Sequence, residues 1–136
     1  MKPYCVTVVR YVLPAMRVLI MNELLEKYDL SKMEVAKRMC VTPAAITQYS
    51  KGVRGSSYIK ELSGSEEIMK KISEISKDAA DDEANFESIM DNMCEICRLI
   101  RSDKLICALH ANEFPESKLN DCTMCFNDGY DNKVLT

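Results

Sequence analysis

The chain has 136 residues, a length within the range of a single domain, and 47% of them are hydrophobic, which is enough for a core. With one histidine and four glycines, the sequence supports neither an acid–base constellation nor a glycine-rich phosphate loop, so we do not expect an enzyme. Arg10, Pro14 and Arg17 interrupt the apolar N-terminal stretch, which leaves no unbroken run of about 18 residues for a membrane span. Nothing resembles a cleavable secretory signal, and we expect a cytoplasmic protein without membrane contact.

The net charge of −3 hides a division between the two halves of the chain. Residues 1–60 carry ten Lys and Arg against four Asp and Glu, a balance of +6. Residues 61–136 carry eight against seventeen, a balance of −9. This asymmetry predicts a basic part that binds a polyanion and an acidic part with another task. Glycine and serine clusters at residues 55–57 and 63–65 mark the predicted boundary.

The first predicted element is a helix that starts at Pro14, a residue well suited to the first turn of a helix. Met16, Leu19 and Leu24 follow a helical period, and the pattern ends at Asp29. We therefore expect one apolar helix ahead of the more informative stretch that begins at residue 30.

Two short helices joined by a tight turn follow. Ser31 is a natural N-cap for the first, and Glu34 three residues later completes a capping box. Thr42 caps the second helix, with Pro43 at its first position. Because the small residue Ala36 lies where the helices cross, the pattern predicts a helix-turn-helix, with an ordinary helical hairpin as the alternative.

The second of these helices carries the side chains that we expect to read DNA. Gln48 can pair with adenine through two hydrogen bonds, and the methyl groups of Ala44 or Thr47 can contact thymine. Lys51 and Arg54 follow where they can bind phosphates. The full set of predicted DNA-binding residues is Thr42, Pro43, Ala44, Thr47, Gln48, Lys51 and Arg54.

Two amphipathic helices are predicted in the acidic half. The first has a stripe of Ile68, Ile72, Ile75 and Ala79. The second is capped by Asp81 or Asp82, and its apolar side is expected to hold Phe86, Met90, Met93, Cys97 and Ile100. We expect these faces to pack on the DNA-binding part or on a second copy of the chain. A homodimer whose recognition helices lie roughly 34 Å apart would match an inverted-repeat operator in double-stranded DNA.

Five of the seven cysteines and the only histidine lie between residues 94 and 125, in the order C-x2-C, C-x2-H, C-x2-C. Paired C-x2-C elements favour a metal, because both thiols can reach one ion or one cluster iron. A disulfide framework is less compatible with a reducing cytosol and an odd cysteine count. The candidate ligands are Cys94, Cys97, Cys107, Cys122 and Cys125, with the last two competing for one place. Zinc needs only four of them, whereas a fifth thiol suits an exchangeable ligand of an iron–sulfur cluster.

The histidine and the two remaining cysteines are not expected to be metal ligands. His110 is expected to support a ligand from outside the metal's own shell or to be an ordinary surface residue. Cys5 and Cys40 lie far from the cysteine cluster in the sequence, and Cys40 is expected to fill the turn as a small hydrophobic residue.

The stretch LSKMEVAKRMCVTPAAITQYSKGVRG resembles the helix-turn-helix of the lambda-repressor/Cro-like regulators, also called the xenobiotic-response-element (XRE) family, over roughly residues 15–55. Cys40 stands where that family usually has a glycine in the turn, which implies a left-handed backbone at a modest cost. A wider stretch from Pro3 to Gly55 is similar to archaeal regulators, including the DNA-binding part of thiamine-responsive ones. Some of these continue into a cysteine-rich tail, and the chain looks like archaeal regulators proposed to sense iron–sulfur flux.

Together these patterns predict an all-α fold, with an N-terminal helix-turn-helix bundle, C-terminal helices and a cysteine-rich metal-binding loop region. Residues 1–60 are expected to form the DNA-binding domain, and residues 61–136 a helical dimerisation and cluster-binding region. The resemblance implies a transcriptional regulator whose DNA affinity is set by an iron–sulfur cluster of the 2Fe–2S or 4Fe–4S type. The alternatives are a regulator with a purely structural zinc site and a zinc-stabilised protein-interaction module.

Overall fold

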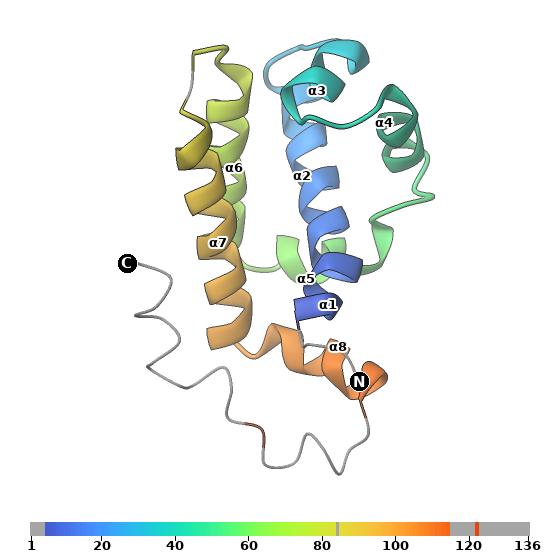
Figure 1. The fold of residues 1–136 in the computed structure, drawn as a ribbon, viewed down its shortest axis with the longest axis vertical. Helices are drawn as coiled ribbons and strands as arrows, with labels where there is room; N and C mark the ends of the chain where they lie inside the picture. The colour runs from blue at the N-terminus through green and yellow to red at the C-terminus, as the bar shows by residue number, and fades with distance from the viewer. Residues whose placement is uncertain (1–4, 84, 115–121, 123–136) are drawn as a thin grey trace.

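A computed structural model describes residues 5–83, 85–114 and 122, and every regular element in them is a helix (Figure 1). This confirms the predicted all-α fold. In chain order the elements are α1 (Cys5–Thr7), η1 (Val8–Val12), α2 (Leu13–Glu26), α3 (Lys32–Arg38), α4 (Pro43–Ser50), η2 (Ser56–Tyr58), α5 (Ile59–Ser63), α6 (Glu66–Ala80), α7 (Phe86–Ser102) and α8 (Leu105–Glu113).

The first three elements form one helical stretch from Cys5 to Glu26. Its wide π-helical turn, η1, ends two residues before Pro14, whose ring and missing N–H do not fit an ordinary α-helical turn. Among the described residues, this helical stretch is long and apolar enough to cross a membrane, although Arg10, Pro14 and Arg17 interrupt it. Much of α2 is buried in the protein, and a core helix of a soluble protein passes the same test, so this is weak evidence for a membrane span.

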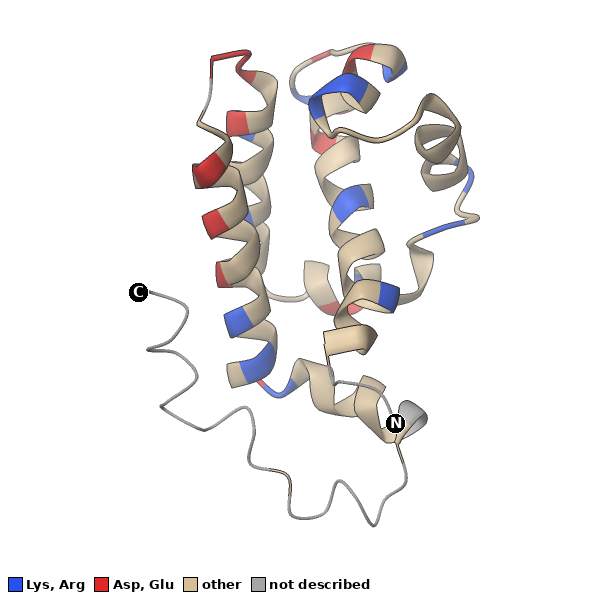
Figure 2. Cartoon of the chain, viewed as in Figure 1, with Lys and Arg blue, Asp and Glu red and all other residues tan. Residues whose placement is uncertain are grey.

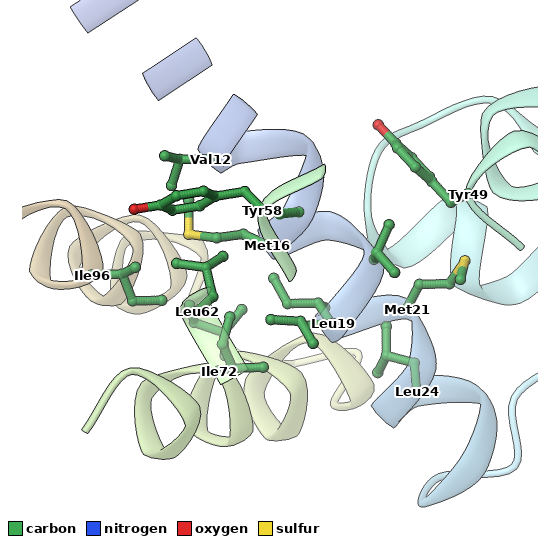
Figure 3. Packing of buried hydrophobic residues seen from close by; sticks show 14 of the residues in the cluster. Val12, Met16, Leu19, Met21, Leu24, Tyr49, Tyr58, Leu62, Ile72 and Ile96 are labelled. Carbon is green, nitrogen blue, oxygen red and sulfur yellow. The ribbon is translucent and has the colours of Figure 1, made fainter. Parts of the chain in front are cut away.

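Helix α2 lies at the centre of the fold, between α3 and α4 on one side and α6 and α7 on the other (Figure 1). It contacts α3, α4, α5 and α6. Met16 and Leu19 of α2 belong to the same buried cluster as Leu62, Ile72 and Ile96, which come from the acidic half (Figure 3). One hydrophobic core therefore extends across residue 60.

The two long helices of the acidic half pack against each other as an antiparallel hairpin, α6 and α7 (Figure 1). The predicted stripe of α6 is confirmed, because Ile68, Ile72, Ile75 and Ala79 are all buried. The stripe therefore packs inside this chain, against α2 and α7.

The buried face of α7 agrees with the predicted one only in part, because Met93, Cys97 and Ile100 are buried or half-buried as expected and the other two predicted residues are not. Ile96 and Ile100 are buried, and Ile89 and Met93 pack against the core. Phe86 and Met90, which the sequence placed on the apolar side, are 60% and 38% exposed. The helix is rotated so that the isoleucines face α6, and the two larger side chains are left on the outside.

The start of α7 also differs from the prediction. The cap is Asn85, whose side-chain oxygen accepts a hydrogen bond from the Glu87 amide at 2.9 Å. Asp81 instead ends α6, and its carboxylate accepts from the Glu83 amide at 3.0 Å. The predicted cap at Asp81 or Asp82 is therefore wrong by about one helical turn.

Candidate functional site

Both predicted caps of the helix-turn-helix are present. The Ser31 hydroxyl accepts from the Glu34 amide at 3.2 Å, and the Thr42 hydroxyl accepts from the Ala45 amide at 3.1 Å. The other half of the predicted capping box is replaced, because the Glu34 carboxylate accepts from Arg38 Nε at 2.8 Å. Each helix of the motif thus begins where its side-chain cap satisfies an otherwise unpaired amide.

The turn between α3 and α4 is built on a left-handed residue. Cys40 has a φ of 55°, as the substitution for glycine implied. Its amide donates to the Lys37 carbonyl at 3.2 Å, and the Val41 amide donates to the Ala36 carbonyl at 3.0 Å. This pair of bonds is a Schellman ending of α3, which turns the chain sharply toward Thr42. Cys40 lies in the turn, where it is exposed.

Helix α4 is held in place by its inner face. Ala45, Ile46 and Tyr49 are buried, and α4 contacts both α2 and α3. Arg17 of α2 lies with its Nη1 atom 3.5 Å from the Tyr49 hydroxyl. The inner face therefore fixes which side chains α4 presents to solvent.

All seven predicted DNA-binding residues, from Thr42 to Arg54, are exposed. The Thr47 hydroxyl donates to the Pro43 carbonyl at 3.2 Å, which leaves its methyl group as the part available to a base. Arg54 Nη1 donates to Gln48 Oε1 at 3.3 Å, and its guanidinium carbon lies 5.4 Å from the centre of the Tyr49 ring. The Gln48 amide keeps a second oxygen lone pair and two N–H donors, so it can still bind an adenine edge.

The charge division of the sequence becomes a division in space (Figure 2). Basic residues lie on α3 and after α4, and many acidic residues lie on the α6–α7 side. Lys32, Lys37, Lys51 and Arg54 are exposed on the helix-turn-helix side. A positive field around α4 suits contact with a phosphate backbone.

Arg38 is the basic residue of this region that faces inward. Its Nη1 atom lies 3.0 Å from both the Ala80 carbonyl oxygen and Asp82 Oδ1, which joins α3 to the end of α6. The hydrogen bond with Arg38 lowers the pKa of the Glu34 carboxyl group, and the same bond raises the pKa of Arg38. Arg38 therefore stabilises the packing of α3 on the end of α6, and we do not expect it to contact phosphates.

The predicted metal ligands are only partly gathered. Cys94 is exposed and Cys97 half-buried on α7, Cys107 is exposed on α8 rather than in a loop, and Cys122 is half-buried. Cys125 lies outside the described residues. Within residues 5–83, 85–114 and 122, no three cysteine, histidine or acidic side chains form a group that could hold a metal ion. One described chain thus does not by itself fit a four-thiolate centre.

Cys5, which is distant from the other thiols in the sequence, lies near this region in the structure. Helix α1 contacts α8, and burial, Cys94 and more weakly Cys5 raise the pKa of the Cys97 thiol. The continuous helix from Cys5 to Glu26 brings α1 to the end of the molecule where α7 meets α8 (Figure 1). Spacing along the sequence contains no signal for this proximity.

His110 is buried on α8, so the prediction of a surface residue is wrong. Its ring meets the Phe114 ring edge to face, with centroids 5.6 Å apart. At the other end of α8, the Tyr58 hydroxyl donates to the Leu105 carbonyl at 2.8 Å. Burial, with smaller effects of Glu61 and Cys107, raises the pKa of Tyr58 to about 12. The hydrogen bond of Tyr58 attaches the cysteine-bearing α8 to the segment that follows α4.

No family model, no curated protein and no solved structure matches the chain. The basis for a proposed function is therefore the geometry of the predicted helix-turn-helix and of the thiols.

Proposed function

We propose that the protein is a sequence-specific DNA-binding transcriptional regulator that acts in the cytoplasm and has no catalytic role. The observation that carries this proposal is the position of helix α4. Thr42 caps its N-terminus, Tyr49 is buried on its inner face, and its outer face is exposed. Short side chains at its start allow the backbone to approach a groove floor. The basic residues beside it supply phosphate contacts.

In this proposal Gln48 is the residue that distinguishes bases. Its hydrogen bond from Arg54 holds the amide in place before DNA arrives, while Lys51 and Arg54 contact the backbone. Preorganised side chains lose less conformational entropy on binding than mobile ones. The methyl groups of Ala44 and Thr47 provide apolar contacts to thymine.

The proposal is tested with an operator selected from a random DNA library. Gln48→Ala should weaken operator binding by about 1–3 kcal/mol and leave binding to random DNA nearly unchanged. Lys51→Ala should weaken both and reduce the salt dependence. Lys77→Ala, which removes an exposed lysine from α6, is the matched control and should change neither.

Two outcomes would count against the proposal. Normal operator affinity for Gln48→Ala would mean that α4 does not read bases. Failure to select any DNA would favour the second candidate, a protein-interaction module that uses the same exposed helix face.

For the cysteines we propose a metal centre, with an iron–sulfur cluster ahead of structural zinc. The support is chemical: Cys94 and Cys97 lie one helical turn apart on α7, a spacing at which two thiols can reach one iron or zinc. The described residues of one chain do not complete a set of four ligands. Protein purified without oxygen should be brown and absorb between roughly 300 and 500 nm. A colourless protein with stoichiometric zinc would decide for zinc.

A further inference from the structure

Helix α7 carries an exposed stripe that nothing in the described chain covers. Phe86, Met90 and Cys94 are four residues apart, so they lie one above the other on the outer side of the helix. All three are exposed, and Phe86 is 60% exposed although it is the largest apolar side chain of the helix. An apolar stripe of this kind on a charged helix is typical of an interaction surface.

The charges beside this stripe are separated along the helix. Glu87 and Asp91 lie in its N-terminal half, Glu95 lies near its middle, and Arg98 and Arg101 lie in its C-terminal half. Glu87 and Asp91 are exposed, and neither forms an ion pair within the described part of the chain. Arg98 donates to Glu95 at 3.0 Å, which leaves further N–H groups of its guanidinium for another carboxylate.

We propose that α7 pairs in antiparallel orientation with α7 of a second copy of this chain, about a two-fold axis near Cys94. In this arrangement Glu87 lies opposite Arg101 of the second copy, since residue 94 is the midpoint of residues 87 and 101, and Asp91 lies within one residue of the position opposite Arg98 of the second copy. A parallel pairing would place like charges opposite each other, which is unfavourable. A two-fold interface uses the same patch twice, and the charge pattern of α7 is complementary to itself only when reversed.

The pairing brings thiols from two chains together. Cys94 lies at the axis, and Cys97 lies one turn away on the side of the stripe that meets the core. The two Cys94 thiols therefore meet at the centre of the interface, and the half-buried Cys97 of each chain lies one turn away from them. The inference rests on the proposed DNA-binding function only because that function leads us to expect a dimer with two-fold symmetry.

The first experiment measures association without DNA. Two helices of about 25 Å bury an area at the low end of specific interfaces, so we expect a dissociation constant on the order of 1 μM. In sedimentation equilibrium, Phe86→Ser should weaken the dimer about tenfold or more. Met33→Ser, which changes a 74% exposed methionine on α3, is the matched control and should leave the dimer unchanged. A dimer that Phe86→Ser does not weaken would overturn the proposal.

The second experiment tests the antiparallel orientation. Asp91→Arg alone and Arg98→Asp alone should each weaken self-association, because both place like charges opposite each other. Mixing the two single variants should restore a dimer that contains one chain of each. If the mixture remains monomeric while the unmodified chain is a dimer, the antiparallel pairing is wrong.

The third experiment uses the thiol at the axis. Mild oxidation at micromolar protein should produce a cross-linked dimer that is lost in Cys94→Ser and kept in Cys107→Ser, because a disulfide needs Cβ atoms about 3.5–4.5 Å apart. Equal cross-linking of both variants would contradict an axis at Cys94. A monomeric protein whose α7 stripe binds a hydrophobic dye only after removal of residues 115–136 would also overturn the proposal, since the chain's own C-terminal segment would then be the cover. Neither result depends on whether the protein binds an operator.

Discussion

Two cysteines one turn apart on the same helix have different surroundings. Cys94 is exposed on α7, whereas Cys97 is half-buried and its thiol has a raised pKa because of burial, Cys94 and Cys5. Arg98 and Arg101 act in the opposite direction but do not cancel these effects. The thiolate form, which reacts with electrophiles and binds metals, is therefore less available at Cys97 in the metal-free protein.

This difference predicts an order of chemical modification. With iodoacetamide at pH 8, metal-free protein should be alkylated at Cys94 and Cys107 before Cys97, because both are exposed. Peptide mass mapping over time gives the order directly. Denatured protein is the control, in which the three rates should converge, and a fast reaction of Cys97 in the folded protein would contradict its burial.

The ion pair of Glu34 and Arg38 predicts a pH dependence of stability. The pKa of Glu34 is lowered from its usual 4.5 in the folded state, so its contribution is present above that value and is lost as the pH falls below it. Glu34→Gln should therefore lower the melting temperature at pH 7 and have less effect as the pH falls below 4.5. The Ser31 cap binds the backbone amide of residue 34 and is retained in the variant. Equal destabilisation at pH 7 and pH 3 would contradict the assignment.

At the scale of elements, the loop after α4 contains two glycines with different tasks. Gly52 has a φ of 72° and open space around it, whereas a Cβ on Gly55, with a φ of 79°, would lie 2.6 Å from the Pro14 carbonyl oxygen and 2.7 Å from Val18 Cγ2. The sequence suggested that Gly55 marks a boundary between two parts. In the structure the chain packs directly against α2 at this residue.

A pair of alanine substitutions separates strain from crowding. Gly52→Ala should cost about 1 kcal/mol, from the left-handed backbone alone. Gly55→Ala should add about 1–3 kcal/mol for displacing the backbone of Pro14 and the side chain of Val18. Urea unfolding of both variants measures the difference, and equal losses of stability would show that the contact with α2 is not tight.

Local signals in the sequence predicted the elements better than their orientation. The caps at Ser31 and Thr42 and the stripe of α6 were predictable because each depends on neighbours along the chain. The orientation of α7 was not, since its apolar residues cover a wide arc and two different stripes fit a helical period. Only the packing of Ile96 and Ile100 against the core decides between them.

At the scale of the whole molecule, long-range contacts that the sequence does not encode locally join the two halves. Arg38 binds the end of α6, Tyr58 binds the start of α8, and Cys5 lies near the thiols of α7. The candidate DNA-reading face could be predicted from one continuous stretch of sequence. The thiol site could not, because its members come from both ends of the chain.

The shared core predicts that the basic half does not fold alone. A fragment of residues 1–60 lacks Leu62, Ile68 and Ile72, which pack in the same cluster as Met16 and Leu19 of α2. We expect this fragment to show no cooperative thermal transition by circular dichroism, and the full chain to unfold in one transition. A cooperative melt of the fragment would support two separate domains divided at residue 60.

The central position of α2 also limits which segments of the chain can be separated and transferred to another protein. A cut after residue 60 removes the helices that pack on one side of α2, the helix that supports α4. If α3 and α4 were transferred to another protein on α2, they would have to be transferred together with α6 and α7 and the apolar faces of those helices. The described helices therefore form one structural unit, in which the apolar faces of α2 and α6 depend on each other for burial.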